Sequence, residues 1–316
     1  MAKVKASFYR MSNEEARAML EALRWPNGPV CPHCQSENVA SLNGKTCRPG
    51  LKKCRDCRKQ FTVTVGTIFE SSHIPLSDWM FAFSAMCQSK KGISALQLQR
   101  QLELGSYESA WFMCHRIRHA MQTTGGLLKG DVEVDEAYVG GKPRKKNFNP
   151  GDNLPEKNNA VGRGTTKVPI VALVQRDGEV RTRVVADVTA KTLKQTIEMH
   201  VNKQESTLYT DDFGQYRTIG REFGGGHFTT KHSIGSYVGP NGEHSNTVES
   251  YFALIKRGVY GNFHHVSAKH LFRYCAEFEF RWNNRHGNDA YRTLEALKQT
   301  SGKRLMYKGT ASNATV

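Results

Sequence analysis

Apolar residues recur every three to four positions over residues 10–25, which predicts a short amphipathic helix. Ser12 and Glu15 stand three residues apart at its start, the spacing of a capping box. Trp25–Pro29 contains two prolines and a glycine and is expected to end the helix. Over residues 30–70 the pattern changes to short β-type runs separated by turns, so a small strand-rich module follows the helix.

A second helical stretch extends from residue 76 to about residue 121, with breaks at Lys91-Gly92 and Leu104-Gly105. Three short helices result, and their succession is typical of a helix-turn-helix unit. The third helix carries Arg116 and Arg118, which we expect to contact DNA. The alternative is the solvated basic face of an ordinary three-helix bundle. The predicted helices span Asp78–Ser89, Ser94–Leu102 and Tyr107–Gln122.

Strand and helix patterns alternate from residue 130 to residue 300, which predicts an α/β domain with a mixed sheet. The strand-like runs are Asp131–Val139, Val168–Val174, Val180–Val188 and Ser206–Asp211. The helix-like runs are Lys191–Asn202, Thr247–Arg257 and Ala268–Asn284. Two polar segments, Gly140–Thr166 and Gly224–His244, fit neither pattern, and we expect them to lie near a site.

The cysteines add a metal site to this picture. Two Cys-x-x-Cys pairs are separated by 19 residues, within the range of a four-cysteine zinc ribbon. The expected zinc ligands are Cys31, Cys34, Cys54 and Cys57. A redox dithiol is the alternative. We interpret His33 and Cys47 as non-ligands and the three cysteines on predicted helices, Cys87, Cys114 and Cys275, as buried thiols.

The charge balance narrows the class of partner. Lys and Arg total 45 against 29 Asp and Glu, a formal net charge of +16. Such an excess favours nucleic acid as the partner. No apolar run reaches the roughly 18 residues of a membrane span, and the N-terminus has no signal-peptide core. We therefore expect a protein of the reducing cytoplasm with no membrane partner.

Acidic residues occupy positions where strands and helices disfavour them. Asp135 lies within the β-branched run Val132–Val139, and Asp211 and Asp212 end another apolar run. Helical spacing places Asn246, Glu249 and Lys256 on one helix face, with Val248, Phe252 and Ile255 packed beneath. Taken individually, these acids also have simpler interpretations. Asp211 or Asp212 can form an Asx turn or a helix cap, and Glu249 can form an intrahelical pair. Glu133 or Glu136 can lie at a solvated strand edge.

Together these acids predict a site for hard divalent cations. Mg²⁺ and Mn²⁺ prefer oxygen ligands, so carboxylates from three distant segments favour these ions and phosphate chemistry. Two such ions about 4 Å apart can activate an attacking hydroxyl and stabilise the departing oxygen of an in-line displacement.

Several long motifs resemble those of a known family. The matching text is CPHC…CRDC, VGTIFESSHIPLSDWMFAF, VEVDEAYVGGK, LYTDDFGQY and HSNTVESYFALIKRGVYGNFHHVSAKHLFRYCAEFEFRWNNR. In these motifs the chain resembles the bacterial Asp-Asp-Glu (DDE) insertion-sequence transposases of the IS1595 family, which carry an N-terminal zinc ribbon and an ISXO-like catalytic domain. The resemblance covers residues 10–300. It implies a ribonuclease-H-like fold, Mg²⁺-dependent cleavage at the ends of a mobile element, and joining of the freed 3′-hydroxyls to target DNA.

Carried over onto this sequence, the resemblance implies three metal-binding acids. Asp135 is the first and Asp211 the second, with Asp212 as the rival. Glu249 is the expected third, with Asn246 as the rival, because some members of the family have Asn there. Lys256 and Arg257 are then expected to contact phosphate near the site. Further expected DNA contacts, with a solvated surface as the alternative, are Lys142–Lys146, His264, His265 and His270.

The resulting hypothesis is a DNA transposase that binds the terminal inverted repeats of its element and a target duplex, as a homo-oligomer in the bacterial nucleoid. A non-catalytic zinc-ribbon and helix-turn-helix regulator and a ribonuclease-H-like nuclease are the alternatives. The expected division of the chain is an N-terminal helix (1–29), a zinc ribbon (30–70), a helix-turn-helix (71–125), a catalytic domain (126–300) and a disordered tail (301–316).

Overall fold

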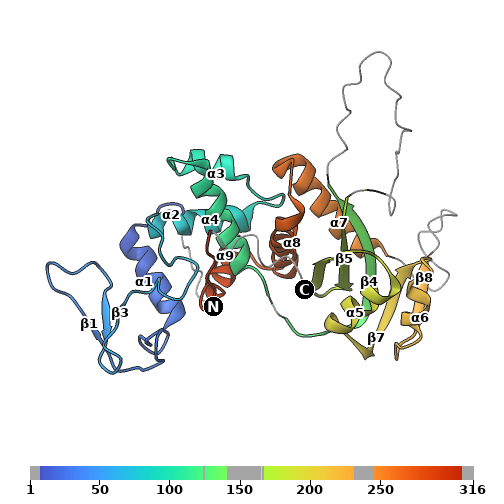
Figure 1. Cartoon of the computed structure of the whole chain (residues 1–316), viewed down its shortest axis with the longest axis horizontal. Coiled ribbons are helices and arrows are strands. Elements are labelled where there is room, and N and C mark those ends of the chain that lie inside the picture. The colour runs from blue at the N-terminus through green and yellow to red at the C-terminus, as the bar shows by residue number, and fades with distance from the viewer. Residues whose placement is uncertain (1–7, 124, 141–164, 166, 231–244, 308–316) are drawn as a thin grey trace, which may run out of the picture. The chain divides into compact units, whose positions relative to one another are not determined.

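The computed structural model describes residues 8–123, 125–140, 165, 167–230 and 245–307, and the chain divides into two compact units (Figure 1). The first unit combines residues 1–122 with 284–316, and the second spans residues 123–283. Within the described residues, no helix is long and apolar enough to cross a membrane.

Helices dominate the first unit. Its first helix begins at the predicted capping box, where the Ser12 hydroxyl accepts a hydrogen bond from the Glu15 N–H (3.2 Å) and the Glu15 carboxylate accepts one from the Ser12 N–H (2.7 Å). Helix α9 packs against α1, α2 and α4, and α3 packs against α4. The helices are α1 (Asn13–Arg24), α2 (Leu76–Gln88), α3 (Ala95–Gln101), α4 (Tyr107–Ala120) and α9 (Asp289–Lys298).

Between α1 and α2 lies the predicted small module. Its strands β1 (Val39–Ser41), β2 (Lys52–Cys54) and β3 (Gln60–Phe61) form an antiparallel sheet in that order. Trp25, just after α1, makes an edge contact with the buried Phe61 ring at 5.9 Å between centroids, which fixes the module to the helix.

Helix α4 does not present the basic face expected of a recognition helix. Arg116 and Arg118 are 5% and 2% exposed. The Arg116 guanidinium donates to the Glu70 carbonyl (2.5 Å) and lies over the Trp79 and Phe112 rings. The planar guanidinium stacks on aromatic faces while its stem packs on apolar surface, so the sequence pattern of a basic helix does not reveal its burial. Their burial contradicts the expectation that these two arginines contact DNA. The helix-turn-helix stays a prediction.

The C-terminal segment differs from the sequence-based expectation. Residues 284–300 belong to the first unit, because α9 completes its helical core. The prediction of disorder from residue 301 is wrong for residues 301–307. Ser301 forms a β-bridge with Thr67, and the Lys303 ammonium donates to the Ala120 and Gln122 carbonyls (2.6 and 2.5 Å). Residues 308–316 lie outside the described part of the chain.

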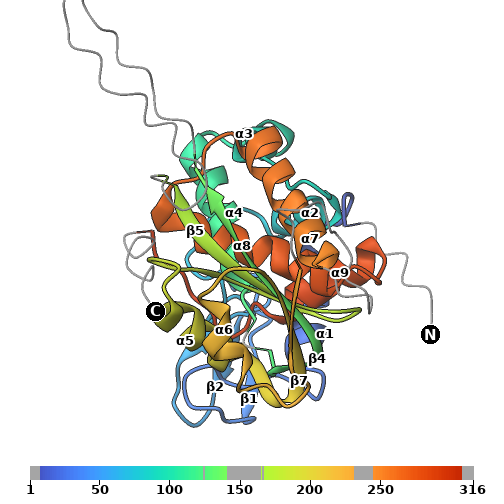
Figure 2. The same cartoon turned by 90° about the vertical axis from the view of Figure 1, so that its right-hand side faces the viewer.

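The second unit contains the predicted mixed sheet, which is confirmed (Figure 2). Its strand order is β6-β5-β4-β7-β8; β4, β5 and β6 pair antiparallel, whereas β7 is parallel to both β4 and β8. Strand β8 falls within a segment that the sequence pattern left unassigned. The strands are β4 (Leu128–Val139), β5 (Val168–Gln175), β6 (Val180–Val184), β7 (Val201–Asp211) and β8 (His227–Thr230).

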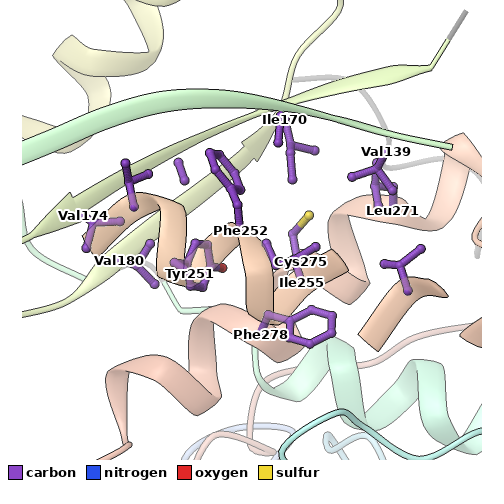
Figure 3. Packing of buried hydrophobic residues seen from close by; sticks show 14 residues of the cluster. Val139, Ile170, Val174, Val180, Tyr251, Phe252, Ile255, Leu271, Cys275 and Phe278 are labelled. Carbon is purple, nitrogen blue, oxygen red and sulfur yellow. The ribbon is translucent and has the colours of Figure 1, made fainter. Parts of the chain in front are cut away.

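Helices cover both faces of this sheet. On one face, α7 and α8 contribute Phe252, Ile255 and Phe278 to an apolar core with alternate residues of β4, β5 and β6 (Figure 3). On the other face, α5 and α6 pack against Val132 and Val134 of β4. The helices of the unit are α5 (Ala190–His200), α6 (Tyr216–Gly220), α7 (Asn246–Gly258) and α8 (Ala268–Asn283), with the π-helical turn η3 (Val259–Phe263) after α7.

Candidate functional site

The four predicted zinc ligands converge in the first unit. The Sγ atoms of Cys31, Cys34, Cys54 and Cys57 all lie within 4.8 Å of one another. Cys31 and Cys57 are 3.6 Å apart, and so are Cys34 and Cys54. A tetrahedron with Zn–S bonds of about 2.3 Å has S···S edges of about 3.8 Å, so this quartet fits a structural zinc ion. Cys47 is outside the quartet, as predicted.

Two matching turns shape the zinc site. Gln35 and Arg58, each directly after the second cysteine of a pair, have positive φ angles of 62° and 60°. Asp56 connects the turns by accepting hydrogen bonds from the Ser36 hydroxyl and from Asn38 Nδ2 (2.9 Å). Hydrogen bonds from the backbone N–H groups of the second turn lower the pKa of Cys54 to about 7, which favours the thiolate that zinc binds.

The basic residues of this module divide into two groups. Lys52 is buried and pairs with Glu21 of α1 at 3.1 Å. The others are exposed and available to a polyanion: Lys45, Arg48, Lys53, Arg55, Arg58 and Lys59.

In the second unit, the strand register places two of the predicted acids side by side. The parallel pairing of β4 with β7 matches Glu133 with Tyr209 and Val134 with Thr210, so Asp135 and Asp211 are the next residues in line. Side chains alternate along a strand, and Asp135 shares its face of β4 with Ala137, which packs in the α7 and α8 core. Asp135 and Asp211 therefore lie on the sheet face covered by α7.

Asp212 has a different environment from Asp211. It is exposed and forms a surface ion pair with Arg217 at 3.6 Å. Asp211 accepts a hydrogen bond from the Phe213 N–H (3.2 Å), which is the Asx turn considered as its simpler interpretation. This turn and a role as a metal ligand are compatible, because a carboxylate has further acceptor sites.

Helix α7 brings the third set of predicted residues to this face. Val248, Tyr251, Phe252, Ile255 and Gly258 are buried. The predicted division of the helix is thereby confirmed. The exposed residues include Asn246, Glu249, Lys256 and Arg257.

The pKa of Asp135 depends in part on the charges of the other two acids. The pKa of Asp135 is raised to about 7, first by burial, then by the charge of Glu136, and also by the charges of Asp211 and Glu249. A bound cation would offset the mutual repulsion of such carboxylates, which raises the pKa of one of them. Two divalent ions about 4 Å apart need ligands from several segments, and these three acids come from β4, β7 and α7.

This raised pKa predicts a pH-dependent stability. Without added Mg²⁺ and with zinc retained, the folded state holds the Asp135 proton up to about pH 7, whereas the unfolded chain releases it near its ordinary value of 3.8. The stabilisation is thus complete below about pH 4 and is lost as the pH rises to about 7. Asp135→Asn, which has no charge, should be more stable than wild type at pH 8, on the order of a few kcal/mol. Urea unfolding from pH 5 to 8 measures this; a stability gap that does not grow with pH would contradict it.

Two further acids of β4, Glu133 and Glu136, lie on opposite faces of the sheet. Glu133 is fully buried, so its interpretation as a solvated strand edge is wrong. Glu136 lies on the opposite sheet face and accepts a hydrogen bond from the Tyr216 hydroxyl (3.0 Å). The only sequence signal for Glu133 is its position two residues before Asp135, which places both acids on one face of the strand.

The expected histidine and lysine contacts with DNA have mixed outcomes. His264 and His265 are exposed after the π-helical turn. His270 is 6% exposed within α8, which contradicts the expectation that it contacts DNA. The insert Lys142–Lys146 lies outside the described residues.

Comparison with known proteins adds independent information. The family model for the ISXO2-like transposase domain matches residues 127–283, nearly the whole second unit. The family model for the transposase zinc-ribbon domain matches residues 11–60. A protein of Halobacterium salinarum (strain ATCC 700922 / JCM 11081 / NRC-1), described as an uncharacterized protein in transposable element ISH50, is 28% identical over 295 residues, which cover 90% of this chain and 96% of that protein.

Proposed function

Because the chain belongs to the IS1595 family of transposases, we propose that it cleaves DNA at the ends of an insertion sequence and joins them to target DNA. The observation that carries this proposal is that the strand register places Asp135 beside Asp211 on the sheet face covered by α7, whose first turn carries Glu249. The charges of Asp211 and Glu249 raise the pKa of Asp135, in keeping with this arrangement. Carboxylates arranged in this way fit Mg²⁺ or Mn²⁺ and phosphoryl transfer.

We infer a ribonuclease-H-like fold for the second unit. Three antiparallel strands followed by two parallel ones, with helices on both faces, support this assignment. The first acid lies on the central strand β4, and the second ends its parallel neighbour β7. Sites in open α/β sheets form at such strand ends.

Each residue has a proposed role. Asp135 and Asp211 hold the metal ions from the sheet, and Glu249 holds them from the first turn of α7. Two bound divalent ions would activate the attacking hydroxyl and stabilise the departing oxygen. Lys256, two turns after Glu249, and Arg257 contact the DNA phosphates beside the site.

The partners follow from this activity. The first unit, with its zinc ribbon and exposed basic residues, recognises the terminal inverted repeats of the element. A transposition event involves two element ends, so we propose a homo-oligomer assembled on DNA. Its chromosomal substrate places the protein with the nucleoid in the bacterial cytoplasm.

The proposal is tested by incubating the purified protein with labelled element-end DNA and a supercoiled target in Mg²⁺. Labelled strands covalently joined to the target support the transposase. Hydrolysis without joining would support the nuclease instead, and end binding with neither reaction in Mg²⁺ or Mn²⁺ would support the non-catalytic regulator.

A pair of variants tests whether Glu249 or Asn246 is the third metal ligand. Glu249→Gln should lower joining by at least about 100-fold, because an amide is a weaker Mg²⁺ ligand than a carboxylate. Asn246→Ala, one turn away on the same exposed face, should retain joining within about threefold. The measurement is the single-turnover rate of joining. The reverse ranking of the two variants would move the ligand to Asn246.

A further inference from the structure

A buried carboxylate joins the strand of the first acid to the helix of the third. Glu133 on β4 has no exposed surface. Its Oε2 atom accepts hydrogen bonds from the backbone N–H groups of Thr247 and Val248, both at 2.9 Å. Its Oε1 atom accepts from the Thr247 hydroxyl and from Arg176 Nε, also at 2.9 Å each.

This contact caps helix α7 from outside the helix. The first N–H groups of a helix have no partner within it and are normally satisfied by a side chain at the N-cap. Ser245 holds the N-cap position but makes no side-chain cap hydrogen bond. Glu133 supplies the acceptor instead, and its charge interacts favourably with the positive end of the helix dipole.

Arg176 extends the connection to the strand of the second acid. Its guanidinium lies 3.8 Å from the centroid of the Tyr209 ring, a cation–π contact. Tyr209 is paired in register with Glu133 and stands two residues before Asp211 on β7. One buried carboxylate thus links β4, β7 and the start of α7, the three elements that carry the proposed metal ligands.

We propose that Glu133 is a positioning residue that sets the distance of Glu249 from Asp135 and Asp211. This inference rests on the proposed function. Val248 is held directly by Glu133, and Glu249 is the next residue along the same helical turn. Loss of the cap leaves the N–H groups of Thr247 and Val248, the second of them buried, without this acceptor, so the first turn of α7 shifts or frays and its carboxylate no longer faces the other two.

The test uses Glu133→Gln, which is nearly isosteric. It has only one acceptor oxygen: if this oxygen accepts from Arg176 Nε, the NH₂ group faces the two helix N–H groups, and if it accepts from those, the NH₂ group faces Arg176 Nε. Either the cap of α7 or its connection to Arg176 is therefore lost. The readouts are Mn²⁺ binding, measured by titration calorimetry on the full-length zinc-loaded protein, and the Mg²⁺ concentration that gives half-maximal joining. We expect both constants to weaken by about 10- to 100-fold, with joining recovered at high metal concentration.

Glu279→Gln is the matched control. Glu279 is also a buried carboxylate of the second unit, and it accepts from the Thr182 N–H (2.9 Å) and pairs with Arg183 (3.2 Å), outside the acid cluster. We expect a loss of thermal stability with unchanged metal constants. Equal metal constants for Glu133→Gln and wild type, or an equal weakening in Glu279→Gln, would overturn the inference.

A milder variant covers the case in which Glu133→Gln does not fold. Thr247→Val removes the hydroxyl that donates to Glu133 Oε1 and so loosens the carboxylate that caps α7. It should weaken Mn²⁺ binding by a few-fold, and unchanged binding in this variant would overturn the inference. If wild-type protein neither binds Mn²⁺ nor joins DNA, the proposed function itself fails, a result distinguishable from either outcome above.

Discussion

Replacing Asp211 by Asn should abolish both end cleavage and joining, whereas replacing Asp212 by Asn should leave both reactions within about threefold of wild type. Asp211 follows the register pair Val134 and Thr210, next to Asp135, and its charge raises the pKa of Asp135. Asp212 is exposed and paired with Arg217. Changes in the residues that orient metal ligands already cost 10- to 100-fold, so losing a ligand should cost at least about 100-fold.

The measurement is the rate of each step on a labelled element end, with gel-shift assays as the control for DNA binding. Asp211→Asn should bind the end as wild type does, because its fold and the first unit are unchanged. Loss of activity in Asp212→Asn together with an active Asp211→Asn would show that the second ligand is Asp212.

The second large effect that we expect follows from loss of the zinc ion. Cys54→Ser should release the metal, unfold the ribbon and abolish specific binding to element ends, because Cys54 is a fully buried member of the quartet. Structural zinc contributes about 10–16 kcal/mol of apparent binding free energy in zinc-finger peptides, more than a three-stranded module of this size can replace. Zinc content, gel-shift affinity and thermal unfolding measure the three effects.

Cys47→Ser is the control for this prediction. Cys47 lies in the same module but outside the quartet, so its replacement should leave zinc content and end binding unchanged. The second unit is a separate compact unit and should keep its own unfolding transition in Cys54→Ser. Full end binding by a zinc-free protein would contradict the account of the ribbon.

The sequence predicted the features that depend on local spacing. The two cysteine pairs converge because the knuckle geometry is contained within each Cys-x-x-Cys motif. The two faces of α7 follow from helical periodicity, with Val248 and Ile255 inward and Glu249 outward. The mixed sheet follows from the alternation of strand and helix patterns.

Long-range packing was not predictable in the same way. Nothing near Arg116 indicates that the Trp79 ring and the Glu70 carbonyl will contact it, and nothing after residue 300 indicates that Lys303 will donate to carbonyls at the end of α4. Glu133 resembles any acid in a strand until α7, more than a hundred residues later, places two N–H groups against it. In each case the deciding partner is distant in sequence and leaves no periodic signal.

The central claim is that Asp135, Asp211 and Glu249 bind the ions that perform the chemistry. Anomalous scattering from Mn²⁺-soaked crystals of the protein with its element-end DNA tests it most directly. The account predicts two Mn²⁺ peaks about 4 Å apart between β4, β7 and the first turn of α7, absent in Asp135→Asn. Ordered DNA ends with no metal peak at these three carboxylates, or peaks that persist in Asp135→Asn, would contradict it.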